Sequence, residues 1–153
     1  MSLFRRAPAE AVALVPPGER ALAWAEASTG WVVATESCLV LADGHQIPWE
    51  SVHRASWDEG VLVLRRGGLG EIRLTLGLEE TRLPEAVRER VEASIVLSER
   101  VTLSRGSAVI MARRPPSGGE INWTVIFENL DAEDPEIRAE ATVEVERLKA
   151  LLP

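Results

Sequence analysis

The segment Trp31–Leu64, with the sequence WVVATESCLVLADGHQIPWESVHRASWDEGVLVL, decides the fold class of this chain. Its short apolar runs are separated by two tight-turn signals, Asp43-Gly44 and Asp58-Glu59-Gly60. Such turns between strand-like runs favour β-hairpins, because the preferred two-residue turns need a positive φ at their central residues. The segment therefore predicts an antiparallel meander, and it contains no motif of reaction chemistry.

Strand-like patterns on both sides extend this meander. Arg20–Ala27 alternates, and Leu22 and Trp24 are predicted to share one face of a half-buried strand. Val61–Arg66 and Glu71–Leu76 are predicted to form a further hairpin. The turn between them, GGLG, lacks the lysine and the following helix of a phosphate-binding loop, so a simple turn is the favoured interpretation.

Two helices are predicted after the meander. Over residues 84–95, four apolar residues recur every four positions and form one stripe, with charged residues on the other side. The stripe consists of Leu83, Val87, Val91 and Ile95. The second helix begins at Asp134-Pro135-Glu136, because Asp suits the N-cap and Pro the first turn. Its apolar face consists of Ile137, Ala141, Val145, Leu148 and Leu152.

The expected fold class is α+β, with one strongly bent antiparallel sheet and a covering helix. We expect an N-terminal arm over residues 1–19 and the meander with its helix over residues 20–95. A C-terminal β-hairpin and helix, residues 96–153, are expected to pack on the same domain. A chain of 153 residues is long enough to bury a core.

The chain is acidic, with a formal net charge of -7. This charge disfavours nucleic acid and anionic membrane surfaces as partners. Cys38 is the only cysteine, so it cannot form an intrachain disulfide, and a small buried strand residue is the favoured interpretation. No apolar run is long enough to span a bilayer or to form a secretory leader, so we expect a cytoplasmic location and no stable membrane insertion.

The segments WVVAT, LVL and IPWESV, which begin at Trp31, Leu39 and Ile47, resemble strand motifs of bacterial pleckstrin-homology-like and GRAM-type domains. The resemblance covers residues 20–95 and implies a split barrel closed by a helix. The lipid-binding members carry Lys or Arg in the first strand-to-strand loop, whereas Ser28-Thr29-Gly30 has no cation here. Phosphoinositide binding is therefore not expected. The whole chain also resembles a bacterial family of this length whose function is unknown.

A metal site is the first chemical alternative. His45 and His53, with Asp43 and Asp58 nearby, supply residue types that bind metals. Two histidines eight residues apart share a face only on an unbroken strand, and Pro48 argues for an edge or a bulge. The sequence contains no catalytic motif of the serine-hydrolase, Cys-x-x-Cys or His-Glu-x-x-His type. We therefore expect neither an enzyme nor a cofactor.

Three residues are candidates for an interaction surface. Most of the five tryptophans are expected in the core, and Trp49, beside Pro48, is the one expected to be partly exposed. Arg113 and Arg114 are expected at the mouth of a Pro- and Gly-rich loop. The sequence thus favours a non-catalytic binding or scaffold module that acts through protein contacts, and also a homodimer built on the C-terminal hairpin and helix. The alternative is a small-molecule or lipid-binding protein that uses the barrel interior or a groove.

Overall fold

The computed structural model describes residues 6–66, 69–77 and 81–152. Within these residues the chain is mixed α+β, its strands form three small antiparallel sheets, and no barrel is closed. The chain divides into two compact units, Met1–Ser94 with Pro115–Gly118 and Ile95–Arg114 with Gly119–Pro153. No helix in the described ranges is long and apolar enough to cross a membrane. The α+β prediction is confirmed at this level.

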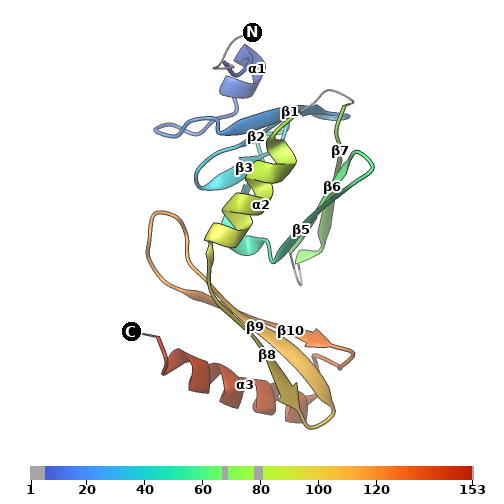
Figure 1. The fold of residues 1–153 in the computed structure, drawn as a ribbon, viewed down its shortest axis with the longest axis vertical. Coiled ribbons are helices and arrows are strands. Elements are labelled where there is room, and N and C mark those ends of the chain that lie inside the picture. Colours follow the sequence, from blue (N-terminus) through green and yellow to red (C-terminus); the bar gives the residue numbers. More distant parts are fainter. Residues whose placement is uncertain (1–5, 67–68, 78–80, 153) are drawn as a thin grey trace. The chain divides into compact units, whose positions relative to one another are not determined.

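The strands of the first unit form a four-stranded sheet in the order β1-β2-β3-β4 and a three-stranded sheet in the order β5-β6-β7 (Figure 1). They are β1 (Ala23–Ala27), β2 (Gly30–Ala34), β3 (Cys38–Val40), β4 (Gln46–Pro48), β5 (Arg54–Asp58), β6 (Val61–Arg65) and β7 (Glu71–Thr75). A 3-10 turn, η1 (Trp49–Ser51), connects the two sheets. An isolated antiparallel bridge also joins Ala27 to Leu76. The expected single bent sheet is therefore two sheets that meet at one corner.

The turn chemistry explains these hairpins. Between β5 and β6, Glu59 and Gly60 adopt φ values of 48° and 80°, which is the positive-φ pair that a two-residue turn requires. Between β3 and β4, Gly44 has a φ of 89° and its amide donates to the carbonyl of Leu41 at 2.8 Å. Pro48 ends β4, an edge strand, where a missing amide costs no ladder bond. The hairpin predictions are confirmed. Gly67 and Gly68, in the expected third turn, lie outside the described residues.

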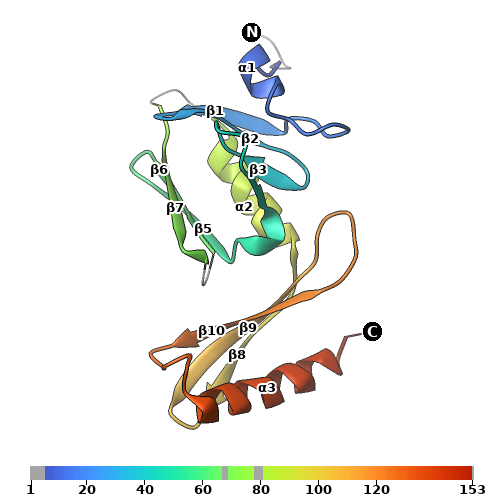
Figure 2. The same cartoon turned by 180° about the vertical axis from the view of Figure 1, so that it is seen from behind.

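The N-terminal arm contains a short helix, α1 (Ala9–Val12), whose Ala11 is buried. It contacts β2. Figure 2 shows α1 from behind, beside the N-terminus. Residues 1–5 of the arm lie outside the described residues.

The core of the first unit lies between its sheets and α2 (Leu83–Ala93), which packs against β1, β2, β5 and η1. Leu83, Val87 and Val91 are buried, so the predicted apolar stripe is confirmed for these three. The prediction for Ile95 is wrong, because the helix is capped at Ser94 and Ile95 begins β8. A nine-residue strand therefore starts where the stripe was expected to continue.

The face of β1 is also opposite to the prediction. Ala23, Ala25 and Ala27 are buried in the core, whereas Leu22 is 36% exposed and Trp24 is half-buried on the other face. Small side chains on the inner face allow α2 to lie close to the strand, since α2 contacts β1. The large indole of Trp24 is consequently placed on the outer face.

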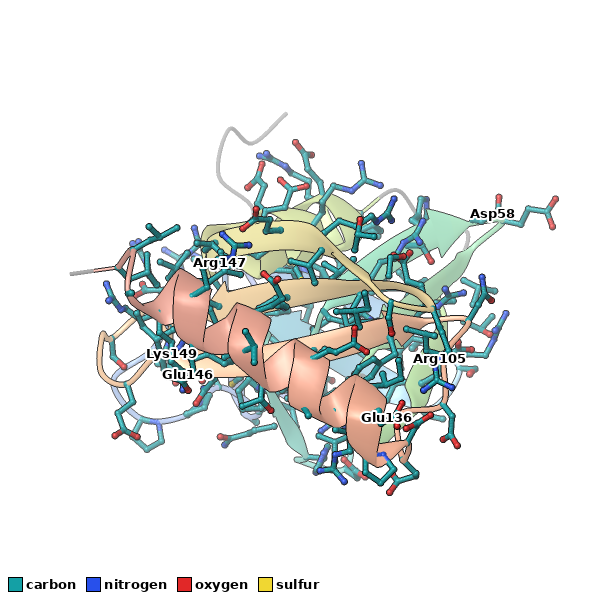
Figure 3. The ribbon with its side chains drawn as sticks, turned by 90° about the horizontal axis from the view of Figure 1, so that it is seen from below. Asp58, Arg105, Glu136, Glu146, Arg147 and Lys149 are labelled. Atoms are coloured by element: carbon teal, nitrogen blue, oxygen red, sulfur yellow. The ribbon has the colours of Figure 1, made fainter. Side chains whose placement is uncertain are left out.

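The second unit is a three-stranded sheet covered by one helix (Figure 3). Its elements are β8 (Ile95–Leu103), β9 (Gly106–Arg113), β10 (Asn122–Glu128) and α3 (Pro135–Lys149), with the strand order β10-β9-β8. The expected C-terminal hairpin is thus a sheet of three strands. Its core contains Val101, Leu103, Ala108, Ile110, Ile137 and Leu148.

The start of α3 is fixed by an N-cap, as the sequence predicts. Asp134 accepts a hydrogen bond from the amide of Glu136 at 2.9 Å, and Arg105 lies 2.7 Å from the same carboxylate (Figure 3 labels Arg105 and Glu136). Desolvation alone would raise the pKa of Asp134. The backbone amides and Arg105 outweigh it and lower the pKa below its ordinary value.

Candidate functional site

A groove of about 920 Å³ runs along β1 in the first unit. This volume is in the range of roughly 300–1,000 Å³ that is usual for ligand sites. Its described walls come from β1 and the residues that flank it, from the end of β7 and the residues after it, and from the start of α2 and the residues before it. Pro8 and Trp31 of β2 complete the described lining. The side chains that bear on chemistry are Trp24, Glu26, Trp31, Thr81, Arg82 and Glu85.

β1 is an edge strand of its sheet, and its other side is contacted by Leu76, Gly77 and Thr81. The carbonyl of Glu26 accepts from the amide of Gly77 at 3.0 Å, and the carbonyl of Trp24 accepts from the hydroxyl of Thr81 at 2.6 Å. Both carbonyls therefore point away from β2. In an antiparallel ladder the amide and carbonyl of one residue point to the same side. The amides of Trp24 and Glu26 thus also point away from β2, toward the side of β1 that Gly77 and Thr81 contact.

The outer face of the first hairpin presents two indoles and a carboxylate. Trp31 lies directly opposite Glu26 in the β1–β2 register, and Trp24 lies opposite Val33. Trp24 and Glu26 alternate with the buried alanines of β1, so they share the outer face with Trp31. Both indoles are half-buried and Glu26 is exposed. An aromatic pair and an acid therefore meet on one surface of the groove.

The charges at the groove are unbalanced. At the start of α2, Arg82 Nε lies 3.8 Å from Glu85 Oε2, so these opposite charges offset each other. Glu26 forms no ion pair with any residue that the structure describes. The carboxylate of Glu26 is therefore the unneutralised charge of the described groove wall. Exposed carboxylates of this kind attract cations, an effect that salt screens.

The groove does not assemble a nucleophile with a base. Ser28, Thr75 and Thr81 supply hydroxyls, but the described lining contains no histidine or cysteine. Hydroxyl groups need an adjacent base to act as nucleophiles. The arrangement is suited to binding a ligand through the two indoles and the carboxylate of Glu26.

Trp49 does not line this groove, and its expected exposure is wrong. Its side chain is fully buried, because η1 turns it into the core of the first unit. The indole Nε1 donates to the carbonyl of Thr35 at 2.9 Å, which satisfies the polar end of the side chain. Trp49 therefore packs in the core, and its candidacy for an exposed interaction site loses its basis.

The other tryptophans are more exposed than predicted. Trp57, in β5, is 40% exposed, and Trp24, Trp31 and Trp123 are half-buried. The expectation that most tryptophans lie in the core is therefore wrong. Trp24 and Trp31 are the two that the groove brings together.

Arg113 and Arg114 lie in different environments. Arg113 is only 1% exposed, because it is the last residue of β9, the central strand, and pairs with Ile95 and Asn122. The expectation that it lies at an exposed loop mouth is wrong. Arg114 is exposed, as expected. The two side chains do not form one basic patch, and neither is part of the groove.

The histidines do not form a metal site in the described residues. His45 is exposed in the turn after β3, and His53 is half-buried before β5. Among the residues placed by the structure, no group of three or more His, Cys, Asp or Glu side chains could hold a metal ion. Cys38 is buried in β3, in agreement with the prediction of a small buried strand residue.

Glu19 is an acid with a structural role. Its Oε1 accepts from the Thr35 hydroxyl at 2.9 Å, the Ser37 hydroxyl at 2.6 Å and the Ser37 amide at 3.1 Å. Burial alone would raise the pKa of Glu19, but the hydrogen bonds from Ser37 and Thr35 outweigh it and lower the pKa. The ionised carboxylate of Glu19 thus connects the segment before β1 to the turn after β2 through these hydrogen bonds.

Sequence reasoning missed the groove residues because they come together from distant parts of the chain. Trp24 and Thr81 are 57 positions apart. The available signal was Trp24 and Glu26 at a two-residue spacing followed by Trp31 across a tight turn, which places the three on one face of a hairpin.

Comparisons with known proteins give no relative. No family model, curated protein or solved structure matches the chain.

Proposed function

We propose that this chain is a non-catalytic protein-binding module of pleckstrin-homology-like architecture, and that the groove beside β1 receives side chains of a partner protein. The observation that carries the proposal is the pair of half-buried indoles, Trp24 and Trp31, that share one face of the first hairpin and line the groove. Tryptophan is enriched among the residues that carry the binding energy of protein interfaces.

The architecture supports the resemblance to pleckstrin-homology-like domains. Four strands and then three form separate antiparallel sheets, and a helix follows the seventh strand. The amide of Ser28 donates to the carbonyl of Thr75 at 2.9 Å, so the two sheets meet at one corner, as in a split barrel. α2 packs between them against β1, β2 and β5. Because fold alone does not fix function, the groove carries the functional part of the proposal.

The alternative is a lipid or small apolar molecule in the same groove. The half-buried indoles would suit such a ligand, and the volume would admit it. The carboxylate of Glu26 in the groove lining favours a peptide, because it would find no hydrogen-bond donor on an acyl chain. The turn at Ser28 has no cation for a phosphorylated headgroup.

The indole N–H signals of the five tryptophans provide a test in a ¹⁵N-labelled sample of the whole chain. Probes are a positional-scanning mixture of acetylated octapeptides, vesicles that contain phosphoinositides, and dodecanoate. Trp24→Phe and Trp31→Phe assign the groove signals. Buried Trp49 and exposed Trp57 are internal controls outside the groove.

The proposal predicts that peptides shift the Trp24 and Trp31 signals and leave those of Trp49 and Trp57 in place. If dodecanoate shifts the Trp24 and Trp31 signals and every peptide leaves them unchanged, the small-ligand alternative replaces the proposal. Vesicle binding that is selective for phosphoinositides would contradict it as well.

A further inference from the structure

We infer that the edge strand β10 of the second unit pairs with β10 of a second copy of this chain, in antiparallel orientation about a two-fold axis at Val125. The pairing joins the two three-stranded sheets into one continuous sheet. This inference concerns the second unit and goes beyond the groove that the proposed function uses. It specifies the strand that forms the expected homodimer.

The side of β10 that faces away from β9 is open in the described part of the chain. β10 stands at the end of the strand order β10-β9-β8. In an antiparallel ladder every second residue of such a strand turns its amide and carbonyl to the outer side. No backbone hydrogen bond joins this side of β10 to another described segment. These amides and carbonyls are therefore free to pair with another strand.

The other edge of the sheet, β8, carries features that prevent strand pairing. Its register with β9 shifts between Ile95 and Leu97, as at a β-bulge. Glu99, in the middle of β8, lies opposite the core residue Ile110 and pairs with Arg147 of α3 at 3.6 Å. Its charge is therefore on the inner face of the sheet. Bulges and inward-pointing charges are devices by which proteins block sheet edges.

β10 has no such protection. It pairs with β9 in regular register over all seven of its residues, NWTVIFE. Its single charged side chain, Glu128, is the last residue of the strand, where Arg100 lies 2.9 Å away and the hydroxyl of Ser107 donates to it at 2.9 Å. The centre of β10 is therefore an uncharged edge that can accept a strand.

The apolar face of the sheet is incompletely covered over β10. Trp123, Val125 and Phe127 alternate along the strand and pack against the core of the unit, but all three are only half-buried. Among the strands of this sheet, α3 lies closest to β8, at the opposite edge. A second copy of β10 brings the same three apolar side chains beside these, which removes apolar surface of both copies from water.

The sequence of β10 is complementary to itself about Val125. Antiparallel pairing about this residue places Trp123 opposite Phe127 of the partner subunit, and directly opposed aromatic residues stabilise a sheet. It also places Asn122 opposite Glu128 of the partner subunit, where the side-chain amide can donate to the carboxylate. No like charges face each other in this register.

Sedimentation equilibrium of the whole chain measures dimerisation, and a lysine at either edge tests where the contact lies. Thr124 on β10 and Thr102 on β8 are both exposed, so the same substitution introduces the same charge at the two edges of one sheet. We expect Thr124→Lys to raise the dimer dissociation constant about 10-fold and Thr102→Lys to leave it unchanged. Urea unfolding at concentrations where the chain is monomeric verifies that both variants are folded.

A thiol at position 125 tests the axis. Directly opposed residues have their Cβ atoms roughly 4.5–5.5 Å apart, so two thiols introduced by Val125→Cys lie within reach of a short bifunctional thiosulfonate reagent. We expect this variant to give a cross-linked dimer, and Thr102→Cys on β8 to give little. The parent chain is the control, because its Cys38 is buried and should not react.

The outcomes are separate from those of the groove. A monomer mass for the parent across a wide dilution range would overturn the inference. A dimer that Thr124→Lys leaves unchanged, or that Thr102→Lys weakens equally, would overturn it as well. Equal cross-linking of Val125→Cys and Thr102→Cys would contradict the axis. The proposed function has its own readout, the indole signals of Trp24 and Trp31, so the failure of one proposal is distinguishable from the failure of the other.

Discussion

The hydroxyl of Thr81 donates a hydrogen bond to the carbonyl of Trp24 at 2.6 Å and accepts one from the amide of Leu83 at 3.1 Å. One side chain therefore connects the edge of β1 to the first residue of α2. This contact fixes one end of the groove.

Removal of the Thr81 hydroxyl should destabilise the first unit. Thr81→Val keeps the shape but leaves the carbonyl of Trp24 and the amide of Leu83 without this partner, at an expected cost of about 1–3 kcal/mol in the free energy of unfolding. Urea unfolding monitored by tryptophan fluorescence measures the change. Thr81→Ser retains the hydroxyl and should recover most of the loss; equal loss in both variants would mean that the methyl group, not the hydrogen bond, matters.

A second prediction for the free energy of unfolding concerns the buried indole of Trp49. Trp49→Phe removes the donor to the Thr35 carbonyl in the core, and we expect a loss of about 1–3 kcal/mol. Trp57→Phe, at a 40% exposed position, is the control and should stay within about 0.5 kcal/mol of the parent. Equal effects of the two substitutions would contradict the assignment of Trp49 to the core.

Packing of α2 on the sheets is tested at Val91, which is 4% exposed. Val91→Asp buries a charge without a counterion, and an unfolding cost on the order of 3–5 kcal/mol is expected. Arg88→Asp introduces the same residue on the exposed side of the same helix and controls for helix propensity. An unchanged melting temperature in Val91→Asp would show that the helix does not pack through this stripe.

The lowered pKa of Glu19 predicts how the free energy of unfolding depends on pH. Its pKa is lowered in the folded state, so its ionised form stabilises the fold at pH values above the ordinary value of 4.5. This contribution is lost as the pH falls from 4.5 through the lowered folded pKa. Glu19→Gln should therefore be less stable than the parent at neutral pH, and the difference should shrink in that acidic window. A difference that stays constant from neutral pH to below this window would contradict the role of the charge.

Self-association through the second unit stays a prediction. The strand order β10-β9-β8 leaves two edges, and Val143 on α3 is 67% exposed. Light scattering after size exclusion at micromolar concentration is expected to give a dimer mass, and Val143→Glu is expected to shift it toward the monomer. A monomer mass across a wide dilution range would remove the prediction.

The elements that could be predicted from the sequence are those with local causes. Gly44 and the Glu59-Gly60 pair determine two hairpins through their backbone conformation, and Asp134 fixes the start of α3 through its own side chain. The stripe of α2 follows from helical spacing. These signals need no knowledge of distant residues.

The remaining features depend on which segments meet. β1 buries its alanines because α2 packs against that face, and the alternation of Leu22 and Trp24 cannot reveal this choice. Arg113 is buried because β9 acquires a strand on each side. The groove joins β1 to the start of α2 through Thr81, so its residues could be predicted only as a hairpin face.

The central claim, that the groove beside β1 binds a partner peptide, is tested most directly by the indole N–H signals of the ¹⁵N-labelled chain. In the presence of a saturating concentration of the octapeptide mixture, the account predicts shifts of the Trp24 and Trp31 signals. The signal of Trp57, which is 40% exposed and outside the groove, serves as the internal control and should change little. Unchanged signals of both Trp24 and Trp31 under saturating peptide would contradict the account.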